Sequence, residues 1–221
     1  MHPNLATEIF TRVAHCEPLK LKALSLYAED LSSVSPEVLT LAVSRLETVE
    51  LPGCRLSPSQ LKLLLNQVAD GKCFKLKLLD LQMNDISQVP SDLLVVATQR
   101  LERVNFRGCK LTTEQLHSVF SDLAEGKCSK LKHLNLSDNN MSQIPSELLV
   151  AATQRLESID FVDFQGSALT TEQVTALYQM VAERRFGSLR KLGISCYVDM
   201  DYTVPPSLIE RAKLNKSVSI F

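Results

Sequence analysis

The sequence contains no tryptophan, and aromatic residues make up only 5% of its 221 residues. Because 45% of the chain is nevertheless hydrophobic, we expect a core built mostly of leucine and valine. The seven glycines form no GxGxxG or GxxxxGK pattern, so no phosphate-binding loop is indicated. No apolar run approaches the roughly 18 residues that span a bilayer, and the N-terminal residues lack the apolar centre of a secretory signal. Loop-based nucleotide binding and membrane insertion are therefore not indicated.

The net charge and the pattern of cysteines exclude further classes of function. The net charge of −1 argues against a nucleic-acid-binding or polybasic membrane surface. The six cysteines form no CxxC and the four histidines are scattered, so neither a metal site nor a cofactor is predicted. We interpret the cysteines as small buried thiols in a reducing, cytoplasmic compartment. They are Cys16, Cys54, Cys73, Cys109, Cys128 and Cys196.

One pattern, LxxLxLxx(N/C)xL, recurs along nearly the whole chain. Its copies begin at Leu21, Leu46, Leu76, Leu101, Leu131, Leu156 and Leu189. The intervals between these starts are 25, 30, 25, 30, 25 and 33 residues, so a short and a long repeat alternate. The last interval exceeds the long type by three residues, which predicts a bulge near Asp163–Ser167. A fixed period of this length is typical of stacked repeat architectures.

Each copy predicts a strand whose leucines face a common core. In the copy that starts at Leu131, Leu134 and Leu136 lie two residues apart, the period of side chains on one face of a strand. Met141 adds an inward residue after the following turn. Because one repeat cannot bury its own apolar face, neighbouring repeats must stack, with parallel strands on one side and helices on the other.

The ninth position of the pattern alternates between two residue types. It is Asn84 and Asn139 in the short repeats, and Cys54 and Cys109 in the long ones. An asparagine there can bond backbone groups of the turn that burial would otherwise leave without partners. We interpret the cysteines as small apolar groups that fill the same position.

Helix signals follow the strands. Ser57, Thr112 and Thr170 each precede a glutamine by three residues, which is a capping-box pattern. Apolar residues then recur at helical spacing. They are Leu116, Val119, Phe120 and Leu123 in one long repeat, and Val174, Leu177, Tyr178 and Val181 in another. The short repeats carry a briefer helix, as in PSELLVAATQR.

This pattern resembles the leucine-rich repeat, and its two alternating repeat types are similar to the ribonuclease-inhibitor-like class, which includes the ligand-sensing repeats of NOD-like receptors. The resemblance implies an α/β solenoid, or horseshoe, of alternating 25- and 30-residue repeats. Its parallel β-sheet would form the concave face and its helices the convex face. We expect one domain over residues 1–221: a partial repeat or cap (1–20), about seven repeats (21–200), and a C-terminal cap with a last strand (201–221). Because residues 1–20 resemble the helical half of a long repeat, we also expect more protein upstream.

A comparison of two short repeats of the chain shows which positions are identical between them and which differ. Residues 76–100 and 131–155 are identical at sixteen of 25 positions. The less conservative differences are Leu78/His133, Gln82/Ser137 and Met83/Asp138. All of these fall on the outward side of the strand or at its exit. A kept frame with a varied outer face is typical of a binding surface, although exposed positions can also simply drift.

The concave face is predicted from positions three, five and seven of each repeat. Its mixture of aromatic, aliphatic and charged residues suits a protein partner better than nucleic acid. The predicted protein-binding residues are Tyr27, Glu50, Leu78, Asp80, Gln82, Arg103, Asn105, Arg107, His133, Asn135 and Asp160. The same positions also include Pro52, Ser137, Ser158 and Gly193. Contact hot spots are expected at Tyr27, Leu78, Arg103, Arg107 and His133.

These observations predict a non-enzymatic recognition module that binds a protein ligand through its concave sheet. No nucleophile elbow or metal-binding helix occurs, so no catalytic residue is predicted. The resemblance implies either an inhibitor similar to ribonuclease inhibitor or the ligand-sensing end of an immune-type receptor. The alternatives are a regulator of an enzyme in trans, as in leucine-rich-repeat GTPase activators, and a structural assembly scaffold. The ligand and the oligomeric state are left open.

Overall fold

The structure is a computed structural model that describes residues 5–16, 20–161, 169–194, 204–215 and 217–220. Helices and strands alternate along the chain, and strands of two or three residues follow helices of eight to twelve. The elements are α1 (Leu5–His15), β1 (Ala23–Ser25), α2 (Pro36–Ser44), β2 (Thr48–Glu50), α3 (Pro58–Ala69), β3 (Leu78–Asp80), α4 (Ser91–Gln99), β4 (Arg103–Asn105), α5 (Thr113–Ala124), β5 (His133–Asn135), α6 (Ser146–Thr153), β6 (Ser158–Asp160), α7 (Thr171–Ala182), β7 (Lys191–Gly193), α8 (Pro206–Lys213) and β8 (Ser219–Ile220).

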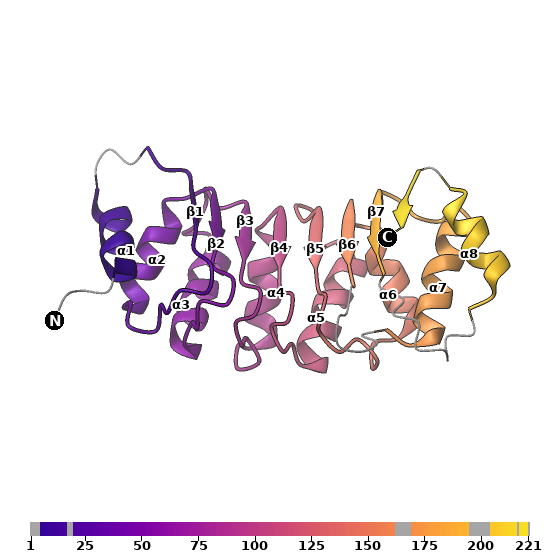
Figure 1. The fold of residues 1–221 in the computed structure, drawn as a ribbon, viewed down its shortest axis with the longest axis horizontal. Helices are drawn as coiled ribbons and strands as arrows, with labels where there is room; N and C mark the ends of the chain where they lie inside the picture. Colours follow the sequence, from indigo (N-terminus) through magenta and orange to yellow (C-terminus); the bar gives the residue numbers. More distant parts are fainter. Residues whose placement is uncertain (1–4, 17–19, 162–168, 195–203, 216, 221) are drawn as a thin grey trace.

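The strands β1 to β8 pair in parallel in chain order and form one sheet. Figure 1 shows the strands side by side in one row, backed by the row of helices, with α1 at one end and α8 at the other. The predicted fold class is therefore confirmed: a solenoid in which each repeat adds one strand to the sheet and one helix to the opposite layer. The predicted last strand also exists, as β8, after the short helix α8.

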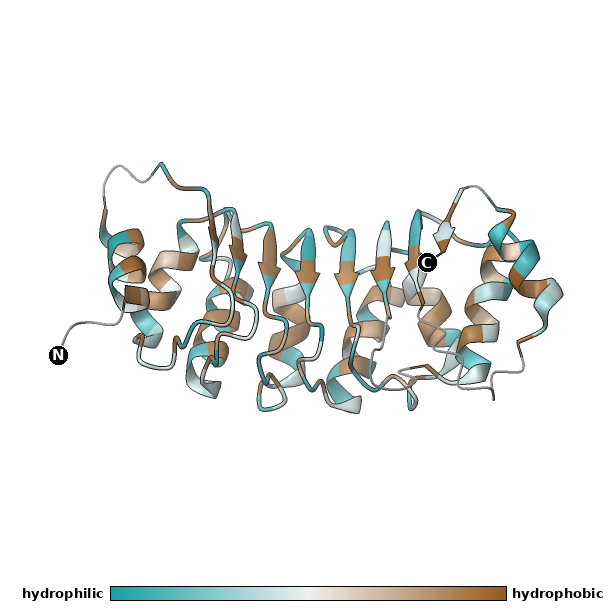
Figure 2. Ribbon diagram, viewed as in Figure 1, coloured by the Kyte–Doolittle hydropathy of each residue, from teal (hydrophilic) through white to brown (hydrophobic). Residues whose placement is uncertain are grey.

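The inward register predicted for the strands is confirmed by burial. Leu131, Leu134, Leu136 and Met141 are all at most 3% exposed. The middle residue of each of the strands β1–β7 is buried, while the first and third residues lie on the other face of the sheet. Figure 2 shows hydrophobic residues along the strands and on the helices of every repeat. One continuous apolar core thus runs between sheet and helices, since no repeat could bury this surface alone.

The asparagine at the ninth position bonds the turn backbone as predicted. Asn84 Nδ2 donates to the carbonyl oxygens of Leu51 (2.8 Å) and Leu81 (3.0 Å), and its Oδ1 accepts from the backbone N–H of Leu56 (3.1 Å). Asn139 repeats these contacts one double repeat later. Because both side chains are at most 5% exposed, they satisfy backbone groups that water cannot reach.

The interpretation of the cysteines needs two corrections. Cys54 and Cys109 do not act only as apolar groups, because each Sγ donates to a carbonyl of the preceding repeat, Leu26 at 3.3 Å and Leu81 at 3.0 Å. The expectation that every cysteine is buried is wrong for Cys16, which lies exposed just after α1. The remaining described cysteines are buried free thiols.

The three predicted capping boxes are present, and their glutamines do more than cap. Gln115 Oε1 accepts from the backbone N–H of Thr112 (2.9 Å), while its Nε2 donates to the carbonyls of Ile86 (2.9 Å) and Val89 (2.6 Å) in the preceding repeat. Gln60 and Gln173 make the same pair of contacts. Each long-repeat helix is therefore fastened to the short repeat before it by a buried amide.

Arg45, which follows the short-repeat helix α2, contacts the end of the helix before it. The guanidinium of Arg45 donates to the carbonyls of Val13, Ala14 and Cys16 at 3.0, 2.7 and 2.8 Å. The first two carbonyls belong to the last turn of α1 and the third follows it directly; a cation there is favoured by the helix dipole and bonds otherwise orphaned acceptors. Arg100 and Arg155 lie in the equivalent places, beside the glycines that follow α3 and α5.

Two expectations fall outside the part of the chain that the structure describes: the bulge near Asp163–Ser167 and the burial of Cys196. Among the residues that are described, no helix is long and apolar enough to cross a membrane.

Candidate protein-binding surface

The outer face of β2–β6, called the sheet face here, carries the predicted binding residues in two parallel rows. One row, called the first row, contains the first residue of each strand. The other, called the third row, contains the third residue of each strand. In register, Leu78, Arg103 and His133 are neighbours in the first row. Glu50, Asp80, Asn105, Asn135 and Asp160 follow one another in the third row. All eleven predicted binding residues, including Tyr27, Gln82 and Arg107 at strand exits, are exposed or half-buried.

Four other positions predicted to face outward are buried instead. Pro52 and Ser137 lie where the chain turns inward after the strand, and their carbonyls accept from the N–H groups of neighbouring turns. Ser158 is only 8% exposed because its small side chain lies in register between His133 and Lys191. Gly193 is buried against Asp160, whose carboxylate occupies the space that a side chain at Gly193 would need.

A shallow hollow of about 200 Å³ lies at the centre of the sheet face. Eight of the eleven predicted residues line it; Tyr27, Gln82 and Arg107 lie outside it. Its lining consists of Glu50, Leu78, Asp80, Arg103, Val104, Asn105, His133, Leu134, Asn135 and Asp160. Leu78 and His133, which occupy equivalent positions of two short repeats, therefore line the same hollow.

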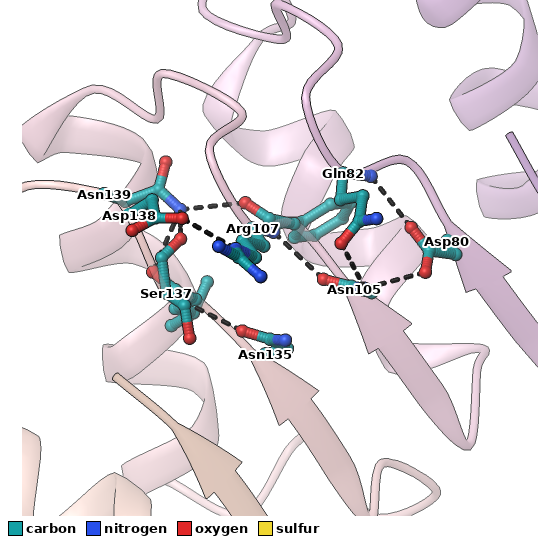
Figure 3. Close-up of polar contacts among 10 residues, drawn as sticks. Asp80, Gln82, Asn105, Arg107, Asn135, Ser137, Asp138 and Asn139 are labelled. Atoms are coloured by element: carbon teal, nitrogen blue, oxygen red, sulfur yellow. Dashed lines mark hydrogen bonds and ion pairs between the residues drawn. The ribbon is translucent and has the colours of Figure 1, made fainter. Parts of the chain in front are cut away.

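Three residues of the third row, Asp80, Asn105 and Asn135, also close the ends of their strands. In each, a side-chain oxygen accepts a hydrogen bond from the backbone N–H two residues later, which is an Asx turn. The bonds join Gln82 N to Asp80 Oδ1 (2.9 Å), Arg107 N to Asn105 Oδ1 (3.1 Å) and Ser137 N to Asn135 Oδ1 (2.9 Å) (Figure 3). Sequence reasoning missed this role, although the recurrence of Asp or Asn at one position of successive repeats was a visible signal.

Side-chain hydrogen bonds then connect the strands across the sheet face. Asn105 Nδ2 donates to Asp80 Oδ2 at 2.7 Å and to Gln82 Oε1 at 3.3 Å (Figure 3). Arg107 Nε bonds Asp138 Oδ2 at 2.6 Å in the next repeat. These contacts hold the side chains of three neighbouring repeats in fixed orientations, so the surface is ordered before any partner binds.

Burial shapes the protonation of the hollow. It raises the pKa of the Asp80 carboxyl, and the neighbouring Glu50 charge adds to the effect, against hydrogen bonds from Gln82 and Asn105 that lower it. The pKa of Asp160 is also raised, mainly by burial. Burial and the charge of Arg103 lower the pKa of His133, so this imidazole is mostly uncharged near neutral pH. The hollow can thus offer hydrogen bonds and carboxylate charge to a ligand.

The edge where the strands begin carries a separate ladder of ion pairs. Glu47 bridges Lys22 and Lys77, with both N–O distances at 3.1 Å, and Lys132 pairs with Glu157 at 3.8 Å. The residue after the first leucine of each repeat is alternately basic and acidic along the chain. Sequence reasoning missed this alternation. Since the charges compensate one another, this edge offers less unpaired charge than the sheet face.

Comparisons with known proteins find a matching segment and a distant structural neighbour. A family model described as Leucine Rich Repeat matches residues 130–150. No curated protein matches the chain. Among solved structures, a leucine-rich-repeat protein of Leptospira interrogans is 15% identical, with a TM-score of 0.46 over 98% of this chain and 56% of that one. The chain thus spans about half the length of that protein. Among the described residues, no group of three His, Cys, Asp or Glu side chains could hold a metal ion. With its recurring LxxLxL motif and its single sheet of parallel strands backed by helices, the chain has the architecture of a leucine-rich-repeat solenoid.

Proposed function

We propose that this chain is a non-enzymatic recognition module that binds a protein ligand through its sheet face. The observation that carries the proposal is the hollow over β2–β6, where charged, amide and aliphatic side chains from five strands converge. Equivalent repeats keep the buried frame but place different residues at this hollow, such as Leu78 and His133. Solenoids generally use such extended surfaces to bind other proteins.

The ordered side chains of the sheet face support the same proposal. Asp80, Asn105 and Asn135 are each held by a backbone N–H of their own turn. A surface that is already ordered loses little side-chain entropy when a partner binds. The exposed Arg103 and the half-buried His133 stand beside these fixed groups and belong to residue types suited to interface contacts.

We further propose that the module works in the cytoplasm as part of an immune-type or regulatory receptor. The buried free thiols support a reducing compartment. The near-duplicate short repeats, residues 76–100 and 131–155, support the receptor assignment over an inhibitor.

Affinity capture with matched variants tests the binding surface. The sheet-face variant carries Arg103→Glu and His133→Asp, and the control carries Lys62→Glu and His117→Asp on exposed positions of α3 and α5. Both variants introduce the same acidic residues in place of one basic residue and one histidine. We expect the sheet-face variant to lose partners that the wild type and the control retain. Retention of every captured partner by the sheet-face variant would contradict the proposal.

A further inference from the structure

The hollow on the sheet face has an uneven distribution of charge. Its lining includes three carboxylates, Glu50, Asp80 and Asp160, but only one guanidinium, that of Arg103. The carboxylates lie in the third row and Arg103 in the first. Since the pKa of His133 is lowered, this residue adds little positive charge near neutral pH. The third row of the hollow is therefore net negative.

The three carboxylates of the hollow are half-buried and, among the described residues, take part in no salt bridge. Glu47, Asp85, Asp122 and Asp138, by contrast, do form salt bridges. Lys191 and His133 act on Asp160 through their charge without reaching it as ion pairs. Partly desolvated carboxylates without a salt bridge are costly to the free protein, and a partner that supplies the cation recovers this cost.

The register places two of the carboxylates next to each other. Glu50 lies directly across from Asp80 on the neighbouring strand, and like charges in this relation repel. Asp160 lies three strands beyond Asp80, which is about 14 Å at the usual strand spacing. Between them, Asn105 and Asn135 provide amide groups in the same row. The row thus has two negative centres separated by hydrogen-bonding groups.

The structure holds Asp80 by hydrogen bonds and makes room for Asp160 on the neighbouring strand. Asp80 is held by the backbone N–H of Gln82 and by the side chain of Asn105. Asp160 lies over Gly193, which leaves room for its carboxylate because it has no side chain. A ligand with cations at a matching separation would therefore meet them without rearranging the surface.

We propose that the protein partner presents a basic segment to the third row, with one lysine or arginine side chain between Glu50 and Asp80 and a second at Asp160. An extended segment with basic residues four positions apart spans about 13–14 Å and matches the two centres. This inference rests on the proposed function and specifies its ligand. Arg103 then faces the flank of the segment, where a carboxylate or carbonyl of the partner can bond it.

A synthetic peptide tests the inference directly. The probe is a fluorescent, extended peptide that is uncharged except for two lysines four positions apart. The control peptide is identical but has glutamates in place of the two lysines. The double variant Asp80→Asn/Asp160→Asn removes both charges, and Asn at position 80 can keep the turn there, because Asn105 and Asn135 already make the same turn contact. The charge-matched control is Asp92→Asn/Glu114→Gln on the helical side, at exposed positions of α4 and α5.

We expect the lysine peptide to bind the intact chain more tightly than the glutamate peptide, and increasing salt to weaken the binding. The Asp80→Asn/Asp160→Asn variant should bind about tenfold more weakly, and the helical-side control should match the wild type. Absence of lysine-peptide binding, equal binding by the double variant, or preference for the glutamate peptide would overturn the inference. If any of these results occurred while partner capture still depended on Arg103 and His133, the proposed function would stand and only the basic ligand would be wrong.

Discussion

Asn105 Nδ2 donates a 2.7 Å hydrogen bond to Asp80 Oδ2 on the neighbouring strand, which joins two repeats on the surface proposed to bind a partner. The carboxylate that accepts this bond is partly desolvated and faces a second carboxylate, Glu50. This charge arrangement on the sheet face costs the free protein stability. Surfaces that serve binding commonly trade stability for function in this way.

Asp80→Asn should remove a loss of stability that the wild type shows as the pH rises. Because the pKa of Asp80 is raised above its usual 3.8 in the folded protein, its ionisation weakens folding, and stability falls as pH rises through this range. The stability of the variant relative to the wild type should therefore increase by about 0.5 kcal/mol between pH 3 and pH 7. The amide cannot accept from both Gln82 and Asn105, but this loss is the same at every pH. Urea unfolding of both proteins from pH 3 to pH 7 measures the difference, and a difference that does not vary with pH would contradict the prediction.

Gln115→Ala should destabilise the stack by about 2–4 kcal/mol. The substitution removes the capping box of α5 and leaves the buried carbonyls of Ile86 and Val89 without the amide that bonds them. Gln143→Ala is the control, since Gln143 is exposed and its removal should change stability by less than about 0.5 kcal/mol. Denaturant unfolding compares the two variants. Similar stabilities would mean that the buried amide does not fasten the repeats together.

Leu134→Ala tests which face of the sheet is the core. Leu134 is 1% exposed, so its truncation should cost about 2–5 kcal/mol. The adjacent His133 points to the other face, and His133→Ala should stay within about 0.5 kcal/mol of the wild type. Thermal melts of the two variants provide the comparison. A negligible shift for Leu134→Ala would show that the inward register is wrong.

The cysteines should differ sharply in reactivity. Burial raises the pKa of Cys109 to about 12 and that of Cys73 and of Cys128 to about 11, so almost no reactive thiolate forms at pH 8. Exposed Cys16 should be alkylated by iodoacetamide in the native protein, whereas these three should react only after unfolding. Peptide mapping by mass spectrometry reads each site separately. Rapid native alkylation of Cys109 would contradict its buried position.

The repeat architecture was predictable because its signals are local and repeated. The LxxLxL spacing located the seven strands that begin at its copies, and the capping boxes located the long helices, since both depend on residues a few positions apart. The outward positions followed from the alternation of side chains in a strand. Leu78 and His133 could thus be assigned to one surface from the amino-acid sequence alone.

The missed features depend on contacts between repeats. Arg45 meets the end of α1 about 30 positions earlier in the chain, and Gln115 reaches carbonyls 26 and 29 positions away. Such contacts require the exact stacking of neighbouring repeats, which no local motif encodes. The burial of Ser158 has the same origin, because the side chains of neighbouring strands determine it.

The central claim is that the sheet face binds the partner, and the affinity of a captured partner for matched variants tests it most directly. Titration calorimetry would compare the wild type, Arg103→Glu/His133→Asp and Lys62→Glu/His117→Asp. We predict at least a tenfold loss of affinity for the first variant and wild-type affinity for the second. Equal affinities of all three proteins, or a loss confined to the helical-side variant, would contradict the claim.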